Sequence, residues 1–132
     1  MSVVRNEIEA GAVYLIFALT ALGEYTIWHS PAHDVEINRN NDHVIKSAIH
    51  TVLEFVCRDI KPYIDSELLK KRALNLIGAG IGHFDSFHVA HAEQVKADFI
   101  TCDDRLLRKC KTNKISVWCG TPVDFCRKEG RI

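Results

Sequence analysis

Apolar residues recur at helical spacing in several parts of the chain. The clearest stripe runs from His43 to Cys57, where the apolar side chains share one helical face. Similar spacing predicts helices over 6–23, with Asn6 and Glu9 as a capping box, and over 65–77 and 84–96. A helix is also expected after Pro31, and short ones over 103–110 and 121–126. The chain is therefore rich in predicted helix.

Three short runs have the β-branched and aromatic character of strands: EYTIWHS at 24–30, ADFITC at 97–102 and ISVWC at 115–119. The segment 60–64, IKPYI, fits only an edge strand, because its proline cannot donate a ladder hydrogen bond. Strands separated by helices favour parallel pairing through right-handed crossovers. We therefore predict a single domain, residues 1–132, with a three-layer α/β fold built on a parallel sheet.

Composition and charge narrow the classes of partner and compartment. The 132 residues are 47% hydrophobic, enough for the core of one domain. Basic and acidic residues number 17 each, so a polyanion would have to meet a local patch. The five cysteines contain no CxxC spacing, which argues against a zinc ribbon and a disulfide framework. Reduced thiols in a cytoplasm are the expectation.

The apolar run from Ala12 to Leu22 raises the question of a membrane span or a signal peptide. A span needs about 18 or more apolar residues, so this run is too short to cross a bilayer. The residues before it include Glu7 and Glu9, where a signal peptide should be positive. We interpret the run as a buried helix and expect no membrane association.

Three acids occupy positions where chemistry is expected. Asp103 directly follows the run ADFITC, and in parallel α/β sheets ligands bind beyond the carboxyl ends of the strands. Asp85 lies at the start of the preceding helix, and Glu36 lies within the helix after EYTIWHS. Other interpretations stay open: Glu36 as a solvated surface acid, Asp85 as a helix cap or dipole partner, and Asp103 or Asp104 as the cap of the next helix.

The segment DSFHVAHAEQVKADFITCDDRLL resembles the closing half of the PIN domain, in which an Asp and a His head a helix and a T-x-D follows the next strand. SPAHDVEINR is similar to the second motif of that family, and VWCGTPVDF is similar to its last strand and end. The resemblance covers nearly the whole chain. It implies a Mg²⁺- or Mn²⁺-dependent endoribonuclease of the VapC-like toxin–antitoxin class, with RNA as substrate and an antitoxin as partner.

Carried over by motif, the resemblance implies Glu36, Asp85 and Asp103 as catalytic and metal-binding acids, with Thr101 and Asp104 as auxiliaries. Such a donor set is consistent with the hard oxygen ligands that Mg²⁺ prefers. Bound metal lowers the pKa of a water that attacks the phosphodiester.

The chain departs from the family at its beginning, where nothing resembles the first strand and its catalytic aspartate. We therefore expect a PIN-like sheet with its N-terminal strand missing and an activity that is weak or lost. The flanking strands would close up, a partner segment would fill the gap, or the exposed edges would drive homodimer formation.

A local basic run follows Asp103, and its members Arg105, Arg108 and Lys109 are candidates for RNA phosphate contacts; a solvated helix face is the alternative. A second hypothesis is a non-catalytic protein that binds an antitoxin-like partner or its own copy. A third is a zinc or redox protein that uses cysteines with His88 and His91, which lie three residues apart on one predicted helix. Metal content and oligomeric state distinguish the three hypotheses.

Overall fold

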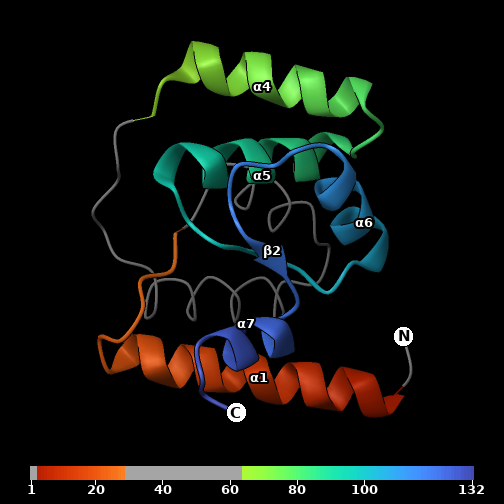
Figure 1. The fold of residues 1–132 in the computed structure, drawn as a ribbon. Helices are drawn as coiled ribbons and strands as arrows, with labels where there is room; N and C mark the ends of the chain where they lie inside the picture. The colour runs from red at the N-terminus through yellow and green to blue at the C-terminus, as the bar shows by residue number, and fades with distance from the viewer. Residues whose placement is uncertain (1–2, 29–63) are drawn as a thin grey trace, which may run out of the picture.

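The computed structural model describes residues 3–28 and 64–132, and these residues form five helices and two short strands (Figure 1). In chain order the elements are α1 (Val3–Ala21), α4 (Ser66–Gly78), α5 (His83–Val95), β1 (Phe99–Ile100), α6 (Asp104–Thr112), β2 (Cys119–Gly120) and α7 (Pro122–Lys128). The stripe at 43–57, the helix after Pro31 and the segment 60–64 lie outside the described residues.

The prediction of a three-layer, parallel-sheet, PIN-like fold is wrong. Of the described residues, 64% are helical and 5% are in strands, and these strands form one two-stranded sheet. β1 and β2 are parallel, as expected, with Phe99 opposite Cys119 and Ile100 opposite Gly120. The described part of EYTIWHS contributes only a single bridging residue, Ile27, and no strand.

The strands are short because the residues next to them belong to helix ends or form hydrogen bonds with side chains instead of with a neighbouring strand. Before β1, Lys96 is in the left-handed conformation and closes α5, and after it Asp103 already caps α6. Before β2, the backbone N–H of Ser116 donates to the carboxylate of Glu93 at 3.0 Å instead of to a neighbouring strand. Apolar, β-branched residues thus stay in extended loops, because other groups satisfy their backbone.

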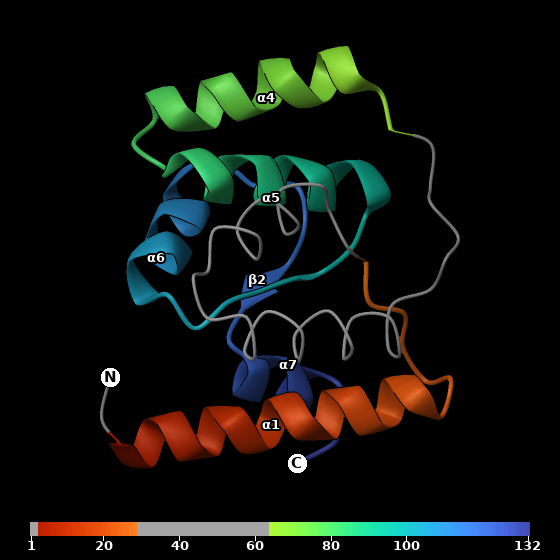
Figure 2. The ribbon, with the colours of Figure 1, turned by 180° about the vertical axis from the view of Figure 1, so that it is seen from behind.

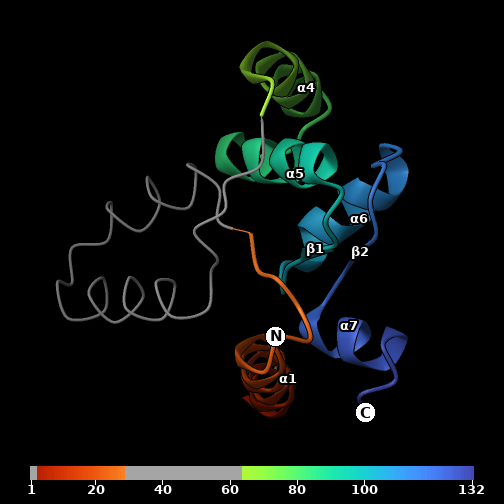
Figure 3. The same cartoon turned by 90° about the vertical axis from the view of Figure 1, so that its left-hand side faces the viewer.

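Helices cover both faces of the strand pair (Figure 3). On one face α4, α5 and α6 enclose a cluster that includes Leu76 and Val89, and Phe99 packs against it. On the other face α1 and α7 enclose a second cluster, against which Ile100 packs. Successive strand residues point to opposite faces, so β1 contributes one side chain to each cluster. Figure 2 shows the same arrangement from behind, with α4 stacked on α5 and α7 against α1.

The first helix is confirmed, but its N-terminal cap and its burial differ from the expectation. It begins at Val3, so Asn6 is inside the helix and Glu9 forms no capping box. Glu9 is instead buried at 6% exposure and accepts a hydrogen bond from the N–H of Val123 at 3.3 Å. Only one face of α1 is buried, since Tyr14 is 73% exposed. Within the described residues no helix is long and apolar enough to cross a membrane.

Glycine ends α1 as the sequence predicts. Gly23 has a positive φ of 85°, and its N–H donates to Thr20 O at 3.0 Å. The next N–H, from Glu24, reaches back to Leu19 O at 2.9 Å. These two bonds form a Schellman motif, which glycine favours because it carries no Cβ.

Candidate functional site

The carboxyl end of β1 leads directly into the segment where the sequence places its T-x-D. The N–H of Thr101 donates to Gly120 O at 3.0 Å, which extends the ladder with β2 by one bond. Thr101 Oγ1 then accepts a hydrogen bond from the N–H of Asp103 at 3.2 Å. Thr101 thus fixes the backbone that presents Asp103.

Asp103 is the N-cap of α6 and is exposed to solvent. Its Oδ1 accepts from the N–H of Arg105 at 3.0 Å and from that of Leu106 at 3.2 Å. The expectation that Asp103 or Asp104 caps this helix is therefore confirmed for Asp103. Both cap bonds end on Oδ1, and a carboxylate has a second oxygen with acceptor capacity of its own.

Asp104 is held by α1. Arg5 donates two hydrogen bonds to it, Nη1 to Oδ2 and Nη2 to Oδ1, each at 2.7 Å. The hydrogen bonds from Arg5 hold the pKa of Asp104 below its ordinary value, and they raise the pKa of Arg5. Bidentate geometry of this kind is typical of a strong arginine–carboxylate contact. Sequence patterns did not predict this partner, because Arg5 lies 99 positions away along the chain, in α1.

Asp85 lies in the first turn of α5 and is half-buried. The N-cap of that helix is Gly82, which makes no side-chain cap bond, so the interpretation of Asp85 as the capping residue is wrong. Asp85 Oδ2 lies 3.6 Å from the position that a Cβ on Gly82 would occupy. A carboxylate in the first helical turn is favoured by the helix dipole, so this alternative role is consistent with the position.

Lys109 Nζ donates to the carbonyl oxygen of Gly80, in the turn before α5. This contact joins the C-terminal half of α6 to the start of α5, and it gives Lys109 a structural partner. Arg105 and Arg108 are exposed on α6. Of the basic residues proposed for RNA, these two present solvent-exposed guanidinium groups beside Asp103 and Asp104.

The described residues do not assemble a complete metal site. Glu36 lies outside them, so its distance to Asp85 and Asp103 is not part of the structure described. Within residues 3–28 and 64–132, no group of three or more His, Cys, Asp or Glu side chains is placed to hold a metal ion. This finding also leaves the zinc hypothesis for His88 and His91 without a described ligand cluster.

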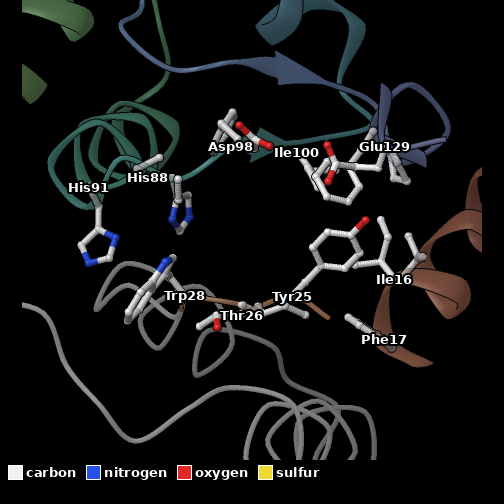
Figure 4. Close-up of a pocket in the computed structure, with 17 residues that line it drawn as sticks. Ile16, Phe17, Tyr25, Thr26, Trp28, His88, His91, Asp98, Ile100 and Glu129 are labelled. Atoms are coloured by element: carbon white, nitrogen blue, oxygen red, sulfur yellow. The ribbon is translucent and has the colours of Figure 1, made fainter. Parts of the chain in front are cut away.

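His88 and His91 are both buried, and they face a pocket of about 410 Å³ between α1, α5, β1 and α7. Figure 4 shows the two histidines and Trp28 at one end of this pocket and Tyr25 at the other. The wall is mostly apolar. Sequence reasoning did not find this pocket, since its lining comes from segments far apart along the chain, and the aromatic residues at 25–28 were the only local sign of it.

The polar rim of the pocket is closed by ion pairs. Lys128 Nζ lies 3.0 Å from Asp98 Oδ2 and 2.9 Å from Glu129 Oε2. The hydrogen bond to Glu129 raises the pKa of Lys128, and that of Glu129 is lowered in turn. These charges satisfy one another, and the rest of the lining is mostly apolar and aromatic, with His88 and His91 as its buried polar side chains.

Comparison of the chain with protein-family profiles, curated proteins and solved structures gives no match.

Proposed function

We propose that this protein is a metal-dependent endoribonuclease of the toxin–antitoxin class that acts in a cytoplasm, with Mg²⁺ or Mn²⁺ held by Glu36, Asp85 and Asp103, and with weak activity because the first acid of the resembled site has no counterpart in this chain. The proposal rests on the order and spacing of the motifs around these acids. Carboxylate oxygens suit either ion, and a few of them suffice because Mg²⁺ keeps several waters and takes phosphate oxygens of its substrate.

The observation that carries the proposal is the position of Asp103. Its exposed carboxylate follows β1, the strand parallel to β2, with only Thr101 and Cys102 between the strand and the acid. Both cap bonds use Oδ1, so Oδ2 can serve a second role without loss of the cap. Thr101 holds the backbone beneath it.

In this proposal the bound ion supplies the attacking water, and nearby side chains bind the RNA and hold α6 in place. A bound ion supplies a water of lowered pKa and offsets charge on the leaving oxygen. Arg105 and Arg108, exposed on the helix that Asp103 begins, would contact the phosphates of the RNA. The Asp104 carboxylate is paired with Arg5, so it would not bind the metal ion itself. It would assist the site indirectly, because this ion pair fixes the first turn of α6 against α1.

The test is cleavage of a labelled single-stranded RNA with Mn²⁺, by the intact chain and by Asp103→Asn and Asp85→Asn. Asn also caps helices, so Asp103→Asn keeps α6 while it removes the charge. Asp65→Asn is a matched control, because Asp65 caps α4 through the same pair of bonds, to the N–H groups of Glu67 and Leu68, each 3.1 Å. We expect at least tenfold slower cleavage for the first two variants, unchanged cleavage for Asp65→Asn, and loss on addition of a chelator.

Two results would overturn the proposal. One is cleavage by Asp103→Asn at the rate of the control. The other is a folded sample, by circular dichroism, in which the intact chain cleaves no RNA at any Mn²⁺ concentration tried.

A second candidate function is binding of another copy of this chain without catalysis. Val4 and Ile8, one helical turn apart on α1, are 66% and 56% exposed and lie beside a surface groove that also contains Arg5 and Asp124. Contiguous exposed apolar side chains mark interaction surfaces. Light scattering should then give a dimer for the intact chain and a monomer for Ile8→Glu, with neither protein cleaving RNA.

A further inference from the structure

Two free thiols lie together between α6 and β2. Cys110, in α6, is buried at 3% exposure, and Cys119, in β2, is half-buried. Cys110 belongs to the core cluster of α4, α5 and α6, and Cys119 packs against the same cluster. The strand register explains this, because Cys119 stands opposite Phe99, which also faces that cluster. The fold thus brings together two cysteines that the sequence separates by a helix end and a loop.

The two thiols, which face the same core cluster, shift each other's pKa. A hydrogen bond with Cys119 lowers the pKa of Cys110, although burial acts in the opposite direction. The same hydrogen bond, together with burial, raises the pKa of Cys119. Cys110 therefore loses its proton more readily than an ordinary thiol, whereas Cys119 keeps its proton. The S–H group of Cys119 stabilises the thiolate of Cys110. A thiolate next to a second sulfur is the arrangement from which a disulfide forms, because the second sulfur can attack the first once that is oxidised.

We propose that Cys110 and Cys119 form an intramolecular disulfide when the folded protein meets hydrogen peroxide, and so constitute an oxidation-sensitive site. This proposal does not depend on the ribonuclease function. It concerns a covalent bond between α6 and β2, the two elements that flank the loop 113–118.

The chemistry balances without any further reactant. The thiolate of the pair attacks one peroxide oxygen, so an S–O bond forms, the O–O bond breaks and hydroxide leaves. The second sulfur loses its proton and attacks the resulting sulfenic sulfur, so the S–S bond forms and the S–O bond breaks. Two thiols lose two electrons in total, one peroxide gains them, and the two thiol protons leave with the two hydroxides as two waters.

The other described cysteines stand apart from this pair. Cys126 is fully buried in the second core cluster, where its Sγ lies 3.9 Å from Ala12 O. Cys102 lies in the loop between β1 and α6, and burial raises the pKa of its thiol. Neither has a second sulfur recorded beside it in the described residues, so the structure favours Cys110–Cys119 over their combinations.

The experiment is peptide mapping of the folded intact chain after brief treatment with hydrogen peroxide, followed by alkylation and digestion without reductant. Trypsin cuts between Cys110 and Cys119 at Lys111, and a protease that cuts before Asp124 separates Cys119 from Cys126. We expect a disulfide that joins the peptides of Cys110 and Cys119, loss of two of the five alkylatable thiols, and recovery of both on addition of dithiothreitol.

Two controls make the outcome specific. Cys119→Ser should abolish this linked peptide, whereas the matched variant Cys126→Ser should retain it. The intact chain treated with peroxide in urea should give several different disulfides, because in the unfolded chain the contact frequency of two cysteines depends only on their separation along the sequence. The proposal is overturned if the folded chain is oxidised without the Cys110–Cys119 peptide, or if that peptide is no more abundant in the folded chain than in urea.

Discussion

Gly120 offers the sharpest test of the packing in this fold, since it stands under the indole of Trp118. A Cβ at this position would lie 2.4 Å from Cη2 and 2.6 Å from Cζ2 of that ring, and 3.2 Å from Asp124 Cβ. Carbon atoms pack best about 3.5–4.0 Å apart. The Gly120→Ala change therefore forces the indole, the strand or the first turn of α7 to move.

The cost of that movement follows from what holds the indole. The Trp118 ring lies 6.1 Å from the Phe125 ring, centroid to centroid, and Lys128 Nζ lies 5.0 Å from the Trp118 centroid. Phe125 is itself buried in the second core cluster, so the indole cannot swing away without loss of these contacts. Overpacking of this kind costs about 1–3 kcal/mol. We expect Gly120→Ala to lower the free energy of unfolding by that amount.

The assay is urea denaturation followed by circular dichroism, with Gly11→Ala as a matched control. Gly11 lies inside α1, and apart from its chain neighbours and the nearby backbone of its own helix no described atom lies within 4 Å of its Cβ position. The Gly11→Ala change should raise the free energy of unfolding by about 0.5–1 kcal/mol, because alanine has a higher helix propensity than glycine. Opposite signs for the two variants are expected. If Gly120→Ala is as stable as the unchanged chain, the packing of Trp118 over β2 is not as described.

Two further predictions concern charge. Glu93 accepts hydrogen bonds from Arg72, at 2.8 Å, and from the N–H of Ser116; burial opposes ionisation, but these bonds outweigh it and hold the pKa of Glu93 below its ordinary 4.5. Glu93→Gln should cost about 1 kcal/mol at neutral pH in urea denaturation. The difference should shrink as the pH falls from 4.5 through the lowered pKa, and a constant difference at all pH values would contradict the assignment. Asp104 has its pKa lowered by Arg5, so the stability it contributes is present above its ordinary pKa of 3.8 and is lost as the pH falls through the lowered value. Asp104→Asn should therefore lower the thermal unfolding temperature only at pH values above the lowered pKa of Asp104. The difference should shrink in concentrated salt, since the side chains of Arg5 and Asp104 are both exposed.

Local signals predicted most of the described helices. Asp65 and Asp103 cap α4 and α6 through the same pair of backbone bonds, and Gly23 ends α1 in a Schellman motif. Each of these depends on residues a few positions apart, so the sequence shows them directly. The predicted capping box of Asn6 and Glu9 is wrong because α1 already begins at Val3, and Glu9 accepts a hydrogen bond from the distant N–H of Val123 instead.

The sheet was overpredicted because β propensity reports how a residue fits a half-buried surface, and an extended loop can provide that surface as well. Apolar residues at 97–102 and 115–119 are in contact with helices on both faces, yet only Phe99–Ile100 and Cys119–Gly120 form strands. Backbone partners such as the Glu93 carboxylate decided where pairing ends, and such partners cannot be inferred from periodicity.

The sequence by itself determined most of the helices of the described residues, the parallel direction of the two strands and the placement of Asp103 three residues after the end of β1. The tertiary structure alone decided that Arg5 holds Asp104, that Lys109 reaches Gly80 and that Cys110 meets Cys119. The reason is physical: capping and helical periodicity act within one or two turns of chain, whereas these contacts require separate elements to pack against a shared core.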